Sequence, residues 1–294
     1  MVEATEATLK YWAWDKLKTT PADISRVFTV VQWNTLNSEL SDLAAFPKVD
    51  EKHSSWIYRE KLMEKFLTTI PADFFCLEEV NPKTVESYTK VFDSINRKVK
   101  YYPKKSGFCG VLVAFNDEQW KLTEEQKYHY KEANGKEMTQ VAANLLFKNA
   151  KTDDYVHLIA THLKAKHEFE EVRYAQTQQL VELIKKTKKE VKGKYNTEPK
   201  TVLAGDLNAE PDWKSVKEIT EKSGLTSAFS DAVLTTFKIR DKEQCRVIDY
   251  IFHDPTLKVI SRNAIPTKED FGVNGLPNEF FPSDHFFLVA QFEY

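Results

Sequence analysis

The feature that most constrains the fold of this chain is a series of short apolar runs, each of strand length. The runs are rich in valine, isoleucine, leucine and phenylalanine, which favour β-strands. None is long enough to cross a bilayer. We expect strands at Val27–Trp33, Phe74–Leu77, Gly110–Phe115, Gln140–Phe147, Tyr155–His162, Thr201–Ala204, Val247–Phe252 and Phe286–Phe292.

Two longer stretches show helical spacing instead. In Ser54–Ile70 the apolar residues recur on one helix face, and Pro71 ends the run. Glu168–Lys189 has similar intervals, and a weaker helix starts near Asp212. No Gly/Ser/Pro-rich linker divides the chain. Strands mixed with helices predict one α/β domain with layered sheets.

Polar residues stand at or beside the ends of six of these runs. Buried carboxylates at the edge of a core need a compensating partner, commonly a metal ion. Oxygen ligands suit Mg²⁺ or Mn²⁺, and no Cys/His spacing for zinc is present. The six positions are Asn34, Glu78 with Glu79, His162, Asp206 with Asn208, Asp249, and Asp284 with His285.

Each position has a structural alternative. Taken alone, Asn34 would more simply cap a turn, and His162 would be a buried core histidine. The Gly-Asp-Leu-Asn segment at 205–208 can be read equally as a plain turn. Asp284 and His285 are the least ordinary pair, because an Asp-His beside a strand is a ready acid–base constellation. The joint pattern favours a functional site.

Composition excludes some classes. The net charge is −2 and the pI about 6.4, so the basic surplus typical of nucleic-acid binding is missing. The basic run at 185–194 is either a nucleic-acid contact or the solvated end of a helix, and we favour the latter. Cys76, Cys109 and Cys245 are odd in number and far apart, which argues against a disulfide framework. With no signal or transit pattern at the N-terminus, we expect a cytoplasmic protein that does not contact membranes.

Taken in order, the junctions resemble the motifs of the endonuclease/exonuclease/phosphatase superfamily. They are Trp33-Asn34, Glu78-Glu79-Val80, Thr161-His162-Leu163, Gly205-Asp206-Leu207-Asn208, Asp249-Tyr250-Ile251 and Ser283-Asp284-His285. Further segments are similar to the nocturnin-like subfamily of its deadenylase-like branch: 161–166, 170–176, 205–211, 235–240 and 245–251. Two positions depart from the pattern: Glu78 replaces the usual glutamine, and Cys109-Gly110 replaces Asp-Gly. Glu78 is expected to add charge near the metal.

The resemblance implies a four-layer α/β/β/α sandwich, with two packed mixed sheets flanked by helices. It implies a catalytic domain over residues 27–294, after an N-terminal extension at 1–26, and places the motifs at one rim. We expect a monomer.

The resemblance also implies a metal-dependent phosphoesterase site. Glu79 is the expected primary Mg²⁺ ligand, with Asn34 beside it and Asp284 assisting, and Mn²⁺ is the alternative ion. The expected catalytic set is His285 as general base, Asp249 orienting it, Asp206 positioning water or a second metal, and Asn208 and His162 donating to the phosphoryl oxygens.

For the substrate, the resemblance implies hydrolysis of the 2′-phosphate of NADP(H) to give NAD(H). Lys104, Lys164, Lys166 and Arg246 are the expected phosphate contacts, since lysines act as point charges and arginine as a bidentate fork. The alternative is a poly(A)-specific 3′ exoribonuclease, or another RNA or nucleotide phosphodiesterase on the same metal site. A catalytically inactive binding protein is a third reading. It is the weakest, because every catalytic position holds a competent residue.

Overall fold

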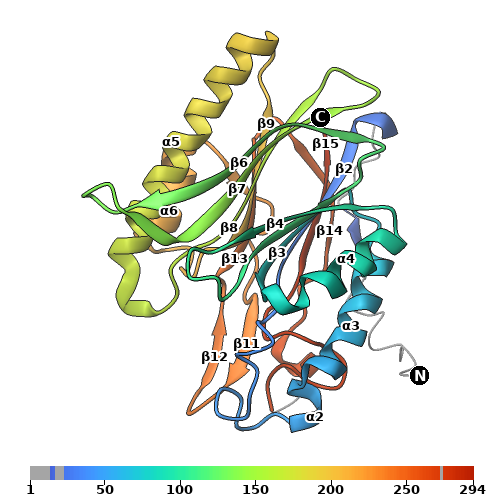
Figure 1. Ribbon diagram of the computed structural model, residues 1–294, viewed down its shortest axis with the longest axis vertical. Helices are drawn as coiled ribbons and strands as arrows, with labels where there is room; N and C mark the ends of the chain where they lie inside the picture. The colour runs from blue at the N-terminus through green and yellow to red at the C-terminus, as the bar shows by residue number, and fades with distance from the viewer. Residues whose placement is uncertain (1–13, 17–22, 272–273) are drawn as a thin grey trace.

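Two β-sheets stacked face to face, with helices on both outer faces, make up the computed structural model, which describes residues 14–16, 23–271 and 274–294 (Figure 1). The first sheet has seven strands in the order β1-β14-β15-β2-β3-β5-β4. The second has six, in the order β10-β13-β9-β8-β7-β6. Both are mixed, since β2 with β3 and β8 with β9 are parallel pairs and the others are antiparallel. The expected four-layer sandwich is confirmed.

The strands of the first sheet are β1 (Trp14–Lys16), β2 (Val27–Asn34), β3 (Phe74–Val80), β4 (Lys98–Pro103), β5 (Gly110–Phe115), β14 (Lys258–Asn263) and β15 (Leu288–Glu293). Those of the second are β6 (Trp120–Lys131), β7 (Glu137–Asn149), β8 (Tyr155–His162), β9 (Lys200–Asp206), β10 (Thr226–Ser227) and β13 (Asp249–His253). A separate two-stranded hairpin of β11 (Thr236–Ile239) and β12 (Glu243–Arg246) projects at one end of the sandwich (Figure 1).

The helices divide between the two outer faces (Figure 1). The first sheet is covered by α3 (Trp56–Thr69) and α4 (Val85–Ser94), with α2 (Glu51–Ser54) before them. The second is covered by α5 (Glu170–Tyr195) and α6 (Lys214–Ser223). Short 3₁₀ turns are η1 (Ile24–Arg26), η2 (Pro82–Thr84), η3 (His167–Phe169) and η4 (Lys268–Phe271). None of the described helices has the length and apolar character needed to span a bilayer.

Three apolar clusters follow from the alternation of side chains along the strands. Phe28 and Val30 of β2 face inward and pack between the sheets with residues such as Phe147 of β7. Val31 and Trp33 of the same strand face outward, toward α3. On the opposite outer face, α5 and α6 pack on β8 and β9. Strands buried on both faces explain the continuous apolar runs in the sequence.

The expected strands and helices are present, with shifted ends. β2 continues to Asn34, and the helix expected at Ser54–Ile70 is α3, which begins after Ser55. The sequence did not predict strands β1, β4, β6, β10, β11, β12 and β14 or helices α2 and α4. The edge strand β6 explains why: it reads Trp-Lys-Leu-Thr-Glu-Glu-Gln-Lys-Tyr-His-Tyr-Lys, and charged residues on an edge strand hide the apolar signal.

Two other expectations meet the structure at particular segments. Trp14–Lys16, inside the expected N-terminal extension, pairs with β14 as an edge strand, while residues 1–13 and 17–22 of that extension lie outside the described part. The basic run at 185–194 belongs to the last turns of α5. Its lysines make ion pairs, including Lys188 with Asp254 at 2.7 Å and Lys194 with Glu124 at 2.8 Å. This supports a solvated helix end.

Candidate active site

Strand register brings the polar junctions to one end of the sandwich. Asn34 is the Cα partner of Glu78 in the parallel pair β2–β3. Asp206 at the end of β9 is opposite both His162 of β8 and Asp249 of β13. Because parallel neighbours end at the same sheet edge, residues far apart in sequence become neighbours there.

Gly205 permits this close approach in the second sheet. A Cβ atom at Gly205 would lie 2.0 Å from the carbonyl oxygen of Thr161 on β8. Any larger residue would push the two strands apart at the point where His162 and Asp206 must meet. The glycine of the Gly-Asp-Leu-Asn segment is therefore a packing requirement of the site.

Asp249 and His285 form a buried acid–base pair. The carboxylate oxygens of Asp249 lie 2.9 and 3.1 Å from Nδ1 of His285. Gln32 donates to one of these oxygens at 3.0 Å and the hydroxyl of Thr235 to the other at 2.7 Å. Burial alone would lower the pKa of His285, but the carboxylates of Asp249 and Asp284 raise it to about 10. The pair has the geometry expected of an oriented imidazole, with Nε2 left for other partners.

Asp206 joins the two sheets. Its carboxylate accepts from the Asn34 amide at 2.9 Å and from the backbone N–H of Asn208 at 2.8 Å. It also lies 3.6 Å from Nε2 of His162. Burial first, and then the neighbouring Asp249, raise the pKa of Asp206 to about 6. The amide of Asn34, on the first sheet, therefore holds the carboxylate of Asp206, on the second sheet, in place.

His162 connects this group to the basic residues. The ring nitrogens lie 3.0 Å from the Asn208 amide and 3.1 Å from Nζ of Lys104. Burial, followed by the positive charge of Lys104, holds the pKa of His162 well below its usual range. A neutral imidazole here can offer one N–H donor to a bound oxygen.

Glu79 lies at an irregularity in β3. The register with β5 shifts between Leu77 and Val80, and Glu79 has a positive φ of 60°. Its carboxylate accepts from the backbone N–H of Asn37 at 3.0 Å. A non-glycine residue in this conformation is uncommon and stores strain, which is a recurrent feature of functional positions.

Glu78 is the residue expected to add charge near the metal. It points into the interior, fully buried, where Gln32 donates to its Oε2 at 2.9 Å and its Oε1 has no partner. Burial, and then repulsion from Asp249 and Asp206, raise the pKa of Glu78 well above its usual range. The raised pKa favours the neutral form of this side chain, which argues against the extra charge expected near the metal. A neutral carboxyl has nearly the shape of the glutamine it replaces.

Asp284 is the ionised carboxylate of the group. Lys238 of β11 donates to its Oδ2 at 2.8 Å, and its buried Oδ1 has no partner. Burial alone would raise the pKa of Asp284, but Lys238 and then His285 lower it to about 2. Since Lys238 balances one charge and Oδ1 is free, Asp284 can still contribute to a cation site.

The donor set fits a divalent cation. Among the residues that the structure describes, Asp206, Asp249 and His285 form the one group of acidic, histidine and cysteine side chains with ligand atoms within 4.8 Å of one another. Burial, followed by repulsion from the neighbouring Asp249, raises the pKa values of Asp206 and Glu78, and a cation would relieve that repulsion. Glu79, the ligand expected from the sequence, is not in that group. The cluster can bind a metal, and it includes residues expected only to be catalytic.

The four expected substrate contacts fall into two places. Lys104 is at the His162 ring, inside the cluster. The other three lie around one arginine: Nη1 of Arg173 donates to the carbonyl oxygens of Lys164 and Lys166, at 2.8 and 2.6 Å. Arg246 joins them through Trp213, whose ring lies under both Arg173 and Arg246.

Some site residues had not been predicted from the sequence. Gln32, Thr235 and Lys238 hold Asp249 and Asp284 in place. Arg59 of α3 donates to the carbonyl oxygens of Pro282 and Thr35, joining the loops that carry His285 and Asn34. A signal existed for Gln32, directly before Trp33-Asn34, and for Thr235 and Lys238, inside the matching segment 235–240. No feature of the sequence pointed to Arg59, because this residue lies within a helix whose pattern indicates only packing.

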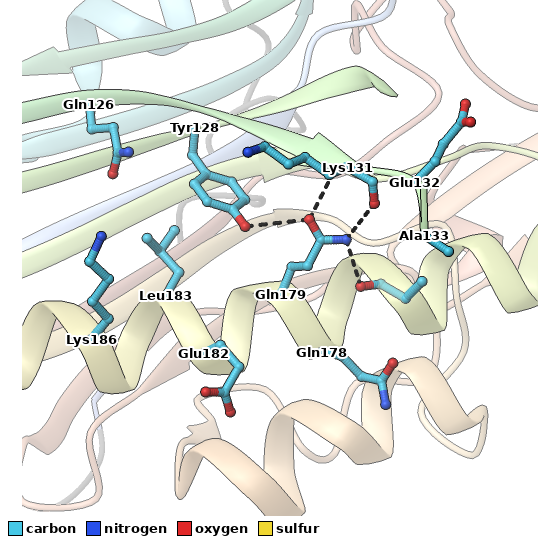
Figure 2. A pocket seen from close by; sticks show the side chains of 11 residues that line it. Gln126, Tyr128, Lys131, Glu132, Ala133, Gln178, Gln179, Glu182, Leu183 and Lys186 are labelled. Atoms are coloured by element: carbon cyan, nitrogen blue, oxygen red, sulfur yellow. Dashed lines mark hydrogen bonds between the residues drawn. The ribbon is translucent and has the colours of Figure 1, made fainter. Parts of the chain in front are cut away.

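A large groove lies elsewhere, between β6 and the N-terminal half of α5, with a volume of about 770 Å³ (Figure 2). Gln179 crosses it, accepting from the backbone N–H of Lys131 at 2.8 Å and donating to the carbonyl oxygen of the same residue at 2.9 Å (Figure 2). None of the expected site residues lines this groove. It is distinct from the candidate active site.

Comparison with known proteins identifies the class of protein that this fold and site define. Residues 31–285 match the model of the Endonuclease/Exonuclease/phosphatase family, so the chain belongs to that family. Enzymes of this family hydrolyse phosphoric esters, and this chain is an enzyme of that class.

Among curated proteins, the chain is similar to nocturnins. It is 26% identical to nocturnin of Xenopus laevis over 291 residues, covering 92% of this chain and 73% of that protein. Human nocturnin is also 26% identical, over 287 residues, covering 90% of this chain and 65% of that protein. The Ccr4 3′-5′-exoribonuclease subunit of the CCR4-Not complex from Saccharomyces cerevisiae is 23% identical, covering 92% of this chain and 39% of that protein. The chain therefore spans between 39% and 73% of the length of these relatives.

Solved structures share the fold. The human nocturnin catalytic domain with a bound sulfate anion superposes with a TM-score of 0.75 at 22% identity, covering 95% of this chain and 96% of that one. ANGEL2, described as a 2′,3′-cyclic phosphatase and solved with adenosine-2′,3′-vanadate, has a TM-score of 0.81 at 19% identity, covering 95% and 97%. At these identities the likeness supports the fold alone.

Proposed function

We propose that this protein is a Mg²⁺-dependent phosphatase that removes the 2′-phosphate of NADP(H), giving NAD(H) and phosphate. The observation that carries the proposal is the placement of the Lys104 ammonium group on His162, inside the catalytic cluster. The backbones of Lys164 and Lys166 are held by Arg173, and Arg246 contacts the same Trp213 ring as Arg173. A dinucleotide with three phosphates needs several cations at separate fixed positions. The similarity to nocturnins also supports this proposal.

Residues 27–294 form the proposed catalytic domain, which contains the family match at 31–285. In it, Glu79 would hold Mg²⁺ together with Asn34 and Asp284, and the free Oδ1 of Asp284 favours this role. When bound, the ion would supply Lewis-acid stabilisation of the phosphoryl oxygens. The reading that fits least is a catalytically inactive binding protein, since the acid–base pair is assembled and oriented.

The protein's own groups would act as follows. His285, fixed by Asp249 through Nδ1, would take a proton from the attacking water at Nε2. A cation balancing the nearby carboxylates would lower the pKa of His285 from about 10 toward the range useful for a general base. Asp206, which belongs to the same buried cluster as His285 and Asp249, would orient the water. Asn208 and His162 would donate to phosphoryl oxygens as charge develops there.

A poly(A)-specific 3′ exoribonuclease is the second candidate, and the similarity to the Ccr4 exoribonuclease subunit favours it. The same metal site and acid–base pair would serve a phosphodiester. The net charge of −2 argues against an extended nucleic-acid surface. RNA binding through phosphates would also be strongly salt-dependent, which offers an independent criterion.

The experiment that separates the two candidates is phosphate release from NADPH, NADP⁺ and a short oligo(A), each with Mg²⁺ or with chelator. We expect metal-dependent release of one phosphate from NADPH and no change in oligo(A). Shortening of oligo(A) with NADPH intact would replace the phosphatase proposal with the exoribonuclease one. Inactivity of the wild type on all phosphoesters would support the binding-protein reading.

The contribution of the basic residues is tested by Lys166→Ala. We expect the KM for NADPH to rise about tenfold, because a charge-assisted phosphate contact is worth about 1.5–3 kcal/mol, while the unfolding temperature stays within a degree or two. Lys186→Ala is the matched control: this exposed lysine of α5 pairs with Glu190 and lines the distant groove. Equal KM values for the two variants would remove Lys166 from the substrate site.

A further inference from the structure

Trp213 contacts two arginines that come from different elements. The guanidinium carbon of Arg173, on α5, is 5.0 Å from the centre of the Trp213 ring, and that of Arg246, on β12, is 5.4 Å away. His167 meets the same ring edge-on, with a centroid distance of 4.8 Å. Cation–π contacts at these distances are attractive, and they strengthen as water is excluded.

The two arginines differ in how their donors are used. Arg173 is fully buried, and it donates to Glu170 and to the carbonyl oxygens of Lys164, Lys166 and His167. These bonds fix the position of its guanidinium group against the 164–167 loop. Trp213 therefore packs on an arginine that is itself held in place.

Arg246 is held on one side only. Its Nε donates to Glu210 at 2.9 Å and its face meets Trp213, while the buried Nη2 has no partner. An unpaired buried donor on a charged group costs more than a neutral one, so it calls for an acceptor. Because Nε and the ring face are occupied, the free Nη2 is the donor that a ligand anion can satisfy.

Two cations lie close together at Trp213. The positive charge of Arg246 contributes, after burial, to lowering the pKa of Arg173, so the two guanidinium groups interact. Each has one glutamate partner, Glu170 or Glu210. The unpartnered Nη2 of Arg246 is therefore a donor left for an anion.

We infer that Trp213 is a positioning residue for phosphate recognition: it holds the guanidinium of Arg246, together with Glu210, so that the free Nη2 edge meets a substrate phosphate away from the reacting one. This rests on the proposed function in that the substrate is a nucleotide with more than one phosphate. Trp213 itself touches Arg246, not the reacting atoms. Its loss should therefore change KM and leave kcat nearly unaltered.

The test compares Trp213→Leu, Trp213→Phe, Arg246→Ala and the double variant Trp213→Leu/Arg246→Ala on NADPH with Mg²⁺. We expect Trp213→Leu to raise KM about five- to tenfold at nearly constant kcat, in line with a partly desolvated cation–π contact. Trp213→Phe keeps an aromatic face, so its KM should lie much closer to that of the wild type than the KM of Trp213→Leu does. In the Arg246→Ala background, Trp213→Leu should change KM less than twofold, because the group it positions is gone.

Tyr174→Leu is the matched control. Tyr174 supplies a ring at the same contact between α5 and α6, but its cation is Lys214, at 4.8 Å. We expect its KM to match that of the wild type. Thermal unfolding of every variant identifies those that fail to fold. If Trp213→Leu does not fold, Trp213→Phe still reports on the role of the ring.

A binding measurement separates this inference from the proposed function. The probe is adenosine 2′,5′-bisphosphate, titrated by calorimetry in chelator so that no turnover occurs. If the wild type does not hydrolyse NADPH but binding of the probe still weakens in Trp213→Leu and not further in the double variant, the phosphatase proposal fails and the positioning role stands. If NADPH is hydrolysed and the losses from Trp213 and Arg246 simply add, or kcat falls instead of KM rising, the positioning role is overturned.

Discussion

At the scale of single residues, the site contains buried carboxyl groups whose pKa values shift in opposite directions. Glu78 has a raised pKa, because it is buried near Asp249 and Asp206 and no lysine or arginine in the described part of the chain donates to it. Asp284 is just as buried, but Lys238 at 2.8 Å keeps it ionised. The partner, rather than the burial, decides which carboxyl carries charge.

Glu78→Gln should stabilise the protein at neutral and higher pH. A carboxyl with a raised folded pKa favours folding only while it is protonated, so wild-type stability falls as pH rises above the unfolded value of about 4.3. The slope from one such group is about 1.4 kcal/mol per pH unit. Glutamine does not titrate, so the difference between variant and wild type should grow as pH rises from about 5 toward the folded pKa of Glu78.

The measurement is urea unfolding in chelator at several pH values. Asp284→Asn is the opposite control: the folded pKa of Asp284 is depressed, so its contribution is present above the unfolded pKa, and removing it should destabilise the protein at pH 7. A Glu78→Gln variant less stable than the wild type at pH 8 would mean that Glu78 is ionised in the native state.

At the scale of elements, three polar side chains join neighbouring strands of the second sheet, away from the site. His157 of β8 is fully buried, and its ring lies 2.6 Å from the side-chain oxygen of Asn144 on β7 and 3.3 Å from the hydroxyl of Thr201 on β9. Burial lowers the pKa of His157 to about 3. A neutral histidine thus ties three adjacent strands together.

His157 should make the protein sensitive to acid. Since its folded pKa is below the unfolded value of about 6.5, the unfolded chain binds the extra proton, and stability falls as pH drops from 6.5 toward 3. The expected contribution is about 1.4 kcal/mol per pH unit in that window. In His157→Gln this slope should be missing. Parallel pH profiles for variant and wild type would show that His157 does not control acid unfolding.

At the scale of the whole molecule, the site exists only where the two sheets meet. Asn34 comes from the first sheet, while Asp206 and Asp249 come from the second. Folding therefore brings several carboxylates into one buried place, which the unfolded chain does not do. A cation bound there would stabilise the native state alone.

Mg²⁺ should therefore raise the unfolding temperature, and chelator should lower it. At an ion concentration a hundred times the dissociation constant, the gain in unfolding free energy is about 2.7 kcal/mol. Thermal unfolding with and without Mg²⁺ is the measurement. Glu79→Ala should lose both this shift and the hydrolytic activity while keeping its fold. An unchanged shift in that variant would exclude Glu79 from the metal site and leave Asp206 and Asp249 as the ligands.

The sequence by itself determined most of the central strands and one α/β domain with layered sheets, because apolar runs of strand length have few alternatives. The four-layer sandwich followed from the order of the polar junctions, through their resemblance to the family's motifs. The sequence did not reveal β6, whose charged edge hides its pattern. Tertiary structure alone decided which groups meet: the burial that raises the pKa of Glu78, the hydrogen bond from Asn34 to Asp206, and the contacts of Trp213 with Arg173 and Arg246. These depend on distances between segments remote in the chain, and pKa values and ion pairs follow from such distances rather than from local sequence.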